Sequence, residues 1–100
     1  MSKLSEEQIS VYLGKLPHWK YEDNALHKTF ELAGFPEAID FVNRIAEYAE
    51  KDRHHPDLLI RYRKVTVTLT THESHGVTGK DFLLAQQIED LKAREIPSHT

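Results

Sequence analysis

The chain has 100 residues, of which 39% are hydrophobic and 29% are charged, the composition of one ordinary globular domain with a single core. Its 16 acidic and 13 basic residues give a formal charge of −3, so no basic stripe is available for a nucleic-acid backbone and we expect no direct nucleic-acid partner. The absence of cysteine excludes disulfides and thiolate metal sites, and the lack of a signal-peptide core or a long apolar run predicts a soluble, cytoplasmic protein with no membrane partner.

The first third of the chain predicts a helix followed by two strands. Ser5, with Gln8 three residues later, is typical of a capped helix start, and a glycine and a proline follow where that helix should end. Residues 19–32 then alternate between apolar and polar side chains around a turn at 22–24, as two strands with one buried face would. Lys28 is the exception, because it falls on the apolar side.

A long central helix is predicted across residues 38–49, where apolar side chains recur at spacings of three and four. It should end before Pro56, since proline disfavours helical geometry in the residue that precedes it. His54 and His55 are therefore expected at a junction between this helix and the next strand.

Two more strands and a last helix complete the pattern. Residues 58–62 and 65–72 alternate as strands, with a tight turn predicted at 63–64 between them. The last helix should begin at Thr78, with Asp81 at the capping-box distance and on the side that faces the sheet.

The predicted order is helix, strand, strand, helix, strand, strand, helix over a single domain of residues 1–100. This order favours an α+β fold with a four-stranded antiparallel sheet and three helices packed on one face. The residues expected to be largely buried are Trp19, Leu26, Phe30, Phe41, Val42, Ile45, Val67, Leu84 and Ile88.

Seven histidines are many for a chain of this length, and four of them fall within residues 54–75. With the turn at 63–64, His55 faces His72 across the hairpin, and His54 is its neighbour. Asp81 reaches the same end of the sheet through a short loop. We therefore expect an acid beside three imidazoles.

Such a group suits general acid/base catalysis, because imidazole exchanges protons near neutral pH and a carboxylate orients the ring. No nucleophile elbow, glycine-rich phosphate loop or HExxH helix is present, so proton transfer is the chemistry indicated. A zinc or iron site is the alternative, and its ligands would be His54, His55, His72 and Asp81. It ranks below proton transfer because two adjacent histidines do not easily bind one ion while they also begin a strand. An exposed turn with a capping aspartate is the plainest alternative.

The stretch from Glu50 to Asp81 resembles the signature of the pterin-4a-carbinolamine dehydratases. That signature combines an acidic residue, a His-His-Pro run, an aromatic residue, a distant histidine and a distant aspartate, and here it is held by Glu50, His54, His55, Pro56, Tyr62, His72 and Asp81. The resemblance extends to the start of the chain, the Trp19 strand and the central helix, so it covers nearly all residues.

The resemblance implies a four-stranded antiparallel sheet with three helices, and an enzyme that removes water from 4a-hydroxytetrahydropterin without metal or cofactor. It implies that His54 and His72 exchange protons, that His55 holds the pterin and that Asp81 orients the group. The residues that it implies line the substrate site, through backbone or side chain, are Arg53, His54, His55, Thr70, Thr71, His72 and Glu73.

Relatives of this kind act beside aromatic amino-acid hydroxylases and form dimers or tetramers, so a homo-oligomer is expected. Some relatives instead serve as dimerisation partners of a transcription factor or as Rubisco assembly factors, and these commonly lose part of the histidine set. Because this chain keeps all three histidines and the aspartate, an enzyme is expected ahead of a non-catalytic binding module. His75 departs from the pattern, in which many relatives have a small residue.

Overall fold

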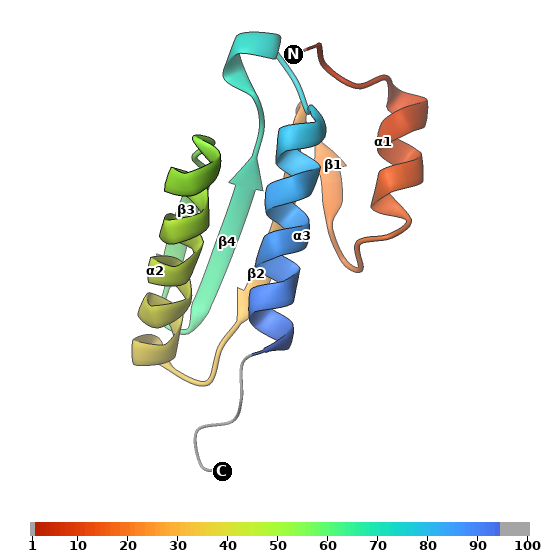
Figure 1. The fold of residues 1–100 in the computed structure, drawn as a ribbon. Coiled ribbons are helices and arrows are strands. Elements are labelled where there is room, and N and C mark those ends of the chain that lie inside the picture. Colours follow the sequence, from red (N-terminus) through yellow and green to blue (C-terminus); the bar gives the residue numbers. More distant parts are fainter. Residues whose placement is uncertain (1, 95–100) are drawn as a thin grey trace.

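Within residues 2–94, the part of the chain that the computed structural model describes, four strands and three α-helices follow in the predicted order (Figure 1). The elements are α1 (Glu6–Leu13), β1 (Lys20–Glu22), β2 (Ala25–Glu31), α2 (Phe35–Asp52), β3 (Asp57–Arg61), β4 (Lys64–Leu69), the short 3₁₀ helix η1 (His72–Ser74) and α3 (Gly79–Ala93).

The strands of the described residues form one antiparallel sheet in the order β1-β2-β4-β3, so β2 and β4 are central and β1 and β3 are edges. On β4, Val65, Val67 and Leu69 are fully buried and alternate with partly exposed threonines. α2 and α3 lie side by side across the buried face, and α1 lies beside β1 (Figure 1). Tyr12 joins α1 to α3 through its ring, whose centroid is 5.0 Å from that of Phe82. The predicted α+β architecture is confirmed.

Both predicted capping boxes are present. The Ser5 hydroxyl accepts from the Gln8 N–H at 3.1 Å, and the Gln8 side chain accepts in return from the Ser5 N–H at 2.9 Å. At α3, Asp81 Oδ2 accepts from the Thr78 N–H at 2.9 Å. Each box satisfies backbone donors that have no partner within the helix, which explains why α1 and α3 begin where they do.

The predicted turn of the β3–β4 hairpin is wrong by one residue. Arg61 pairs with Lys64, so the two turn residues are Tyr62 and Arg63, and Tyr62 has a positive φ of 54°. The register is therefore shifted by two, and the strand pairing ends where Asp57 meets Thr68. His55 and His72 do not face each other across the hairpin as predicted.

The predicted core is confirmed except at one position. Among the residues expected to be buried, eight are, and Val42 is only partly buried. The buried stripe of α2 is formed by Ala38, Phe41, Ile45 and Ala49. Val42 lies at the edge of that stripe, so it packs against the core without being enclosed by it.

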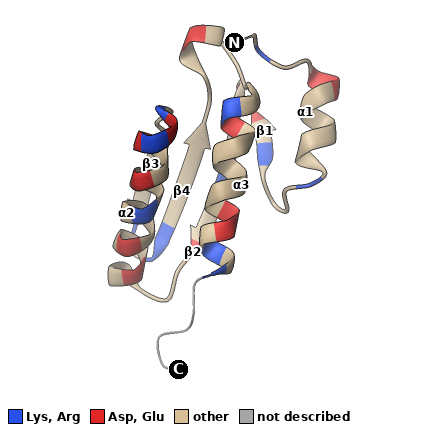
Figure 2. Cartoon of the chain, in the orientation of Figure 1, with Lys and Arg blue, Asp and Glu red and all other residues tan. Residues whose placement is uncertain are grey.

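The position of Lys28 on the apolar side of β2 is explained by an acidic partner on α3. Its Nζ forms an ion pair with Glu89 and donates to the Pro17 carbonyl at 3.0 Å, while the indole N–H of Trp19 donates to Glu89 Oε2 at 2.7 Å. The Lys28 and Glu89 side chains are only 13% and 16% exposed. An acid thus lies in each half of α3, with Asp81 in its first turn and Glu89 nearer its end. Figure 2 shows acidic segments in both halves of this helix.

No helix within residues 2–94 combines the length and the apolar character that crossing a membrane requires.

Candidate active site

The end of α2 delivers His54 to the interior. Arg53 adopts the left-handed conformation, with φ 53° and ψ 42°, and its N–H donates to the Glu50 carbonyl at 3.3 Å. The His54 N–H donates to the Ala49 carbonyl at 3.0 Å. These two bonds close a Schellman motif, which reverses the chain at the helix end. His54 is consequently 8% exposed, although it follows a charged segment.

His54 pairs with Asp81. Its Nε2 lies 2.5 Å from Asp81 Oδ1, and the aspartate is fully buried in the first turn of α3. The two elements that supply them are far apart in sequence, and the pair joins the end of α2 to the start of α3. The predicted contact between an imidazole and the sheet-facing aspartate is present.

Among the described residues, three groups bind the Asp81 carboxylate. Besides His54, the Thr78 N–H donates to Oδ2 at 2.9 Å and the Thr71 hydroxyl donates to Oδ2 at 2.8 Å. Capping and histidine binding thus use different oxygens of one carboxylate. Asp81 can therefore cap α3 through Oδ2 and bind His54 through Oδ1 at the same time.

His72 lies in η1, within a small loop closed on itself. The Thr71 N–H donates to the Gly76 carbonyl at 3.0 Å, and the His75 N–H donates to the His72 carbonyl at 3.1 Å. The His72 side chain is exposed, as is that of His75, which has a left-handed backbone with φ 57°. The loop holds His72 above the end of the sheet.

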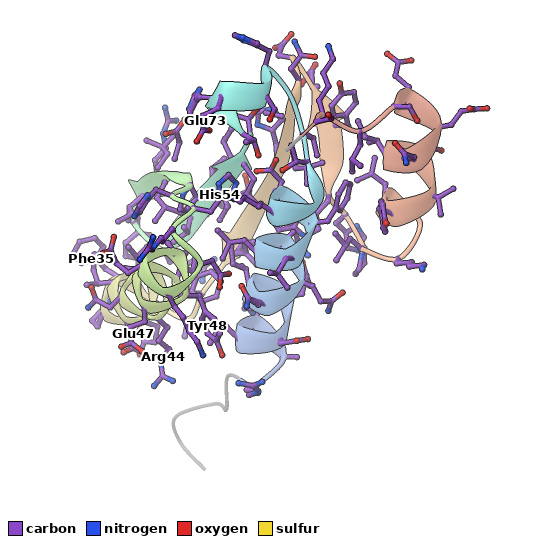
Figure 3. The ribbon with its side chains drawn as sticks, turned by 45° about the horizontal axis from the view of Figure 1, so that its top comes forward. Phe35, Arg44, Glu47, Tyr48, His54 and Glu73 are labelled. Atoms are coloured by element: carbon purple, nitrogen blue, oxygen red, sulfur yellow. The ribbon has the colours of Figure 1, made fainter. Side chains whose placement is uncertain are left out.

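Glu73 links this loop electrostatically to His54. A hydrogen bond that the Glu73 backbone N–H donates to its own carboxylate makes the largest contribution to holding the pKa of this group below its usual 4.5, and desolvation acts in the opposite direction. The charges of Lys80, His54 and His72 lower that pKa further. Figure 3 places Glu73 on η1, near the labelled His54. His54 and His72 therefore act on one carboxylate.

His55 points to a different partner. Its Nε2 lies 2.6 Å from Glu50 Oε2, and both side chains are largely exposed. The predicted group of three histidines is thus divided, with His54 buried, His72 on the loop and His55 on the surface with Glu50. Glu50 is the acidic residue of the family signature, four positions before His54, and this place in the signature is the only sequence signal for its pairing with His55.

The other predicted lining residues have different surroundings. The Thr70 hydroxyl, one residue beyond the end of β4, donates to the Asn24 carbonyl at 2.7 Å. Thr71 is buried and its hydroxyl is directed to Asp81, whereas Arg53 and Glu73 are exposed. Thr78 was predicted only as a helix cap, and nothing in the sequence indicated its hydroxyl bond to Thr71, 2.8 Å long.

No three histidine, aspartate or glutamate side chains within residues 2–94 are arranged so that they could hold a metal ion. A surface hollow of about 310 Å³ lies between α1 and α3, and no histidine is among its walls. Its walls are Tyr12, Lys15, Leu16, Gly79, Phe82, Leu83 and Gln86.

Comparison with known proteins identifies the family of the chain. The family model described as pterin 4 alpha carbinolamine dehydratase matches residues 2–91. The chain belongs to this dehydratase family. A relative from Roseiflexus sp. (strain RS-1), named "Putative pterin-4-alpha-carbinolamine dehydratase", is 49% identical over 90 residues, which are 90% of this chain and 97% of the relative. A relative of the same name from Nocardia farcinica is 48% identical over 88% of this chain and 93% of its own.

A solved structure has the same fold as this dehydratase-family chain. It is described as a transcriptional coactivator/pterin dehydratase from Brucella melitensis, and it superimposes with a TM-score of 0.87 at 34% sequence identity. The match covers 90% of this chain and 98% of that one. The fold expected from the resemblance is confirmed.

Proposed function

We propose that the protein dehydrates 4a-hydroxytetrahydropterin to quinonoid dihydropterin and water. The observation that carries the proposal is the buried pair of His54 and Asp81 next to the loop of His72, in a chain of the pterin dehydratase family. An oriented imidazole and a second imidazole close by are the groups that a metal-free dehydration needs.

The reaction requires one acid and one base. The bond between C4a and the hydroxyl oxygen breaks while that oxygen takes a proton, and the N5–H bond gives its electrons to a new C4a–N5 double bond while its proton passes to a base. One histidine starts protonated and the other neutral, and they end exchanged. A proton returned through water restores the starting state, so the sum is substrate to product plus water.

His54 and His72 take the two proton-transfer roles in this proposal. His54 commits Nε2 to Asp81, and its Nδ1 has no hydrogen-bond partner among the described residues, so Nδ1 is the atom that exchanges a proton with the substrate. Asp81 orients the ring, and His55 holds the pterin together with the other lining residues. Neither metal nor cofactor takes part.

The proposed context is the recycling of tetrahydropterin beside an aromatic amino-acid hydroxylase, with the chain acting as a homodimer or homotetramer. The unpaired outer edge of β3, together with the exposed Leu59 and Tyr62 side chains, supports a second copy as the partner. Sedimentation at micromolar concentration tests this assembly, and a monomeric mass would contradict it.

The direct test is a turnover assay with chemically generated 4a-hydroxytetrahydropterin, followed by its ultraviolet absorbance. The uncatalysed rate must be subtracted because the substrate also dehydrates without enzyme. We expect catalysis well above this background. A corrected rate of zero for the folded protein would refute the proposal.

A second candidate function is a non-catalytic binding module. The observation that favours it is the description of the Brucella melitensis protein as a transcriptional coactivator as well as a pterin dehydratase. Asp81→Asn separates the two candidates, because it keeps the side chain's shape while removing the carboxylate that orients His54. An enzyme should lose far more rate than stability, whereas a binding module has no corrected rate to lose.

A further inference from the structure

We propose that the Thr71 and Thr78 hydroxyls are positioning residues that fix Asp81, and through it the tautomer of His54. The expected effect on rate rests on the proposed function, whereas the hydrogen bonds and the tautomer of His54 do not depend on it. Thr71 and Thr78 are 4% and 0% exposed, and Asp81 is 0% exposed, so these three side chains form a sealed polar cluster under the η1 loop.

The direction of each hydrogen bond follows from what each atom can donate. The Lys80 backbone N–H can only donate, so the Thr78 hydroxyl oxygen accepts from it at 3.2 Å. Asp81 accepts from the Thr71 hydroxyl at 2.8 Å, which uses the single proton of Thr71. The 2.8 Å bond between the two threonines must then be donated by Thr78.

The result is a one-way chain from the start of α3 to the carboxylate. It runs from the Lys80 N–H through Thr78 and Thr71 to Asp81 Oδ2, where the Thr78 N–H donates as well. With two donors on Oδ2, the plane of the carboxylate is fixed, and Oδ1 is left to His54. Asp81 acts only as an acceptor, so His54 must donate through Nε2 and keep Nδ1 for the substrate.

Removing the Thr71 hydroxyl breaks this chain at its centre. The Thr78 hydroxyl loses its acceptor in a buried site, and Asp81 Oδ2 keeps only one donor. The carboxylate can then rotate, so that the geometry toward His54 Nε2 is no longer set. The Thr71 hydroxyl therefore affects the rate by positioning Asp81, and it does not contact the substrate.

The test compares Thr71→Val, which keeps the shape and removes the hydroxyl, with Thr71→Ser, which keeps the hydroxyl. Thr66→Val is the matched control, because Thr66 lies on the opposite face of the sheet, bonded to Thr29. We expect Thr71→Val to lower kcat on the order of 10- to 100-fold with little change in KM, and Thr71→Ser to restore most of it. Thr66→Val should leave kcat unchanged.

A spectroscopic measurement checks the same inference without turnover. In protein with ¹⁵N-labelled histidine, at a pH where the imidazoles are neutral, His54 should be the Nε2–H tautomer in the wild type and in Thr71→Ser. In Thr71→Val the Nε2 signal should shift toward a mixture of tautomers. If Thr71→Val fails to fold, the wild-type spectrum still tests the hydrogen-bond chain. An Nδ1–H tautomer of His54 in the wild type would contradict the proposal.

The two proposals can fail separately. A folded wild type without turnover removes the proposed function, and the His54 tautomer then decides the hydroxyl chain by itself. An active wild type whose Thr71→Val variant keeps both its kcat and its His54 ring signals refutes the positioning role and leaves the dehydratase proposal standing.

Discussion

Two acids on α3, Asp81 fully buried and Glu89 mostly so, differ in what their partners can do. Asp81, in the first turn, binds an imidazole, a hydroxyl and a backbone N–H, while Glu89, two turns later, binds the ammonium of Lys28 and the indole of Trp19. Both carboxylates are largely hidden from water. An imidazole is a side chain that can give or take a proton in catalysis, whereas ammonium and indole groups do not serve in this way near neutral pH. The partner's chemistry, and not burial, therefore distinguishes the candidate active site from a structural ion pair.

The largest effect should follow from removing the proton-transfer groups. We expect the double replacement His54→Ala and His72→Ala to lower the corrected dehydration rate by about 10²-fold or more, the usual cost of losing a general acid or base. The fold should survive because both residues lie at element ends. An unchanged corrected rate, measured on protein with an intact circular dichroism spectrum, would make the binding module the better interpretation.

The other acid should affect stability and not rate. Glu89→Leu leaves the Lys28 ammonium buried without its partner, so the free energy of unfolding should fall by about 3 kcal/mol, measured by urea denaturation. The double variant Lys28→Met and Glu89→Leu should regain most of this loss. In each variant kcat should match the wild type below the unfolding transition. A large loss of kcat in Glu89→Leu would show that the two ends of α3 are coupled.

Relief of strain beside His54 should give a smaller gain. Arg53 has a positive φ of 53°, which costs a side chain with a Cβ more than it costs glycine. Arg53→Gly should raise the free energy of unfolding by about 0.5–1 kcal/mol, after the greater chain entropy of glycine in the unfolded state is set against it. Arg53→Ala is the control and should gain nothing, so equal stabilities of the two variants would contradict this explanation.

The Glu73 carboxylate should make the stability of the protein weakly dependent on pH in the acidic range. Its pKa is lowered in the folded state, so its contribution to stability is present above the usual value of 4.5 and is lost as the pH falls through the lower folded value. Glu73→Gln should therefore be less stable than the wild type near neutral pH, and the two melting temperatures should converge once the pH has fallen below the lowered pKa of Glu73. A difference that grows on acidification would have the wrong sign.

Chelation should have no effect on the rate. The proposed proton transfers are complete with side chains alone, so dialysis against EDTA should leave the corrected turnover unchanged. Loss of activity after dialysis, with recovery on adding zinc or iron, would replace the acid/base proposal with a metal site.

Most of the fold could be predicted because local signals and burial agreed along the chain. The capping boxes begin at Ser5 and Thr78, and the alternation in β4 identifies its buried face. The hairpin register could not be predicted, because a shift of two residues keeps every side chain on the same face and so leaves the alternation unchanged. A tyrosine with positive φ is also uncommon, so Tyr62 gave no sign that it occupies the turn.

The site was predicted in part for a similar reason. The contact of His54 with Asp81 followed from helix phase and family signature, both of which the sequence carries. Two other contacts depend on side-chain directions at a helix end and in a loop. They are the pairing of His55 with Glu50 and the hydroxyl bond between Thr71 and Thr78. Those directions are set by tertiary packing, for which a pattern of residue types contains no signal.

The double use of Asp81 bears on how such a protein could change its role over evolutionary time. One oxygen of its carboxylate holds the start of α3 and the other holds His54. A lineage that abandons catalysis can discard the imidazole and still keep the helix cap, whereas discarding the aspartate would remove that cap and leave the buried Thr71 hydroxyl without its acceptor. Descendants that become binding modules should therefore lose the histidine first and keep the aspartate longer.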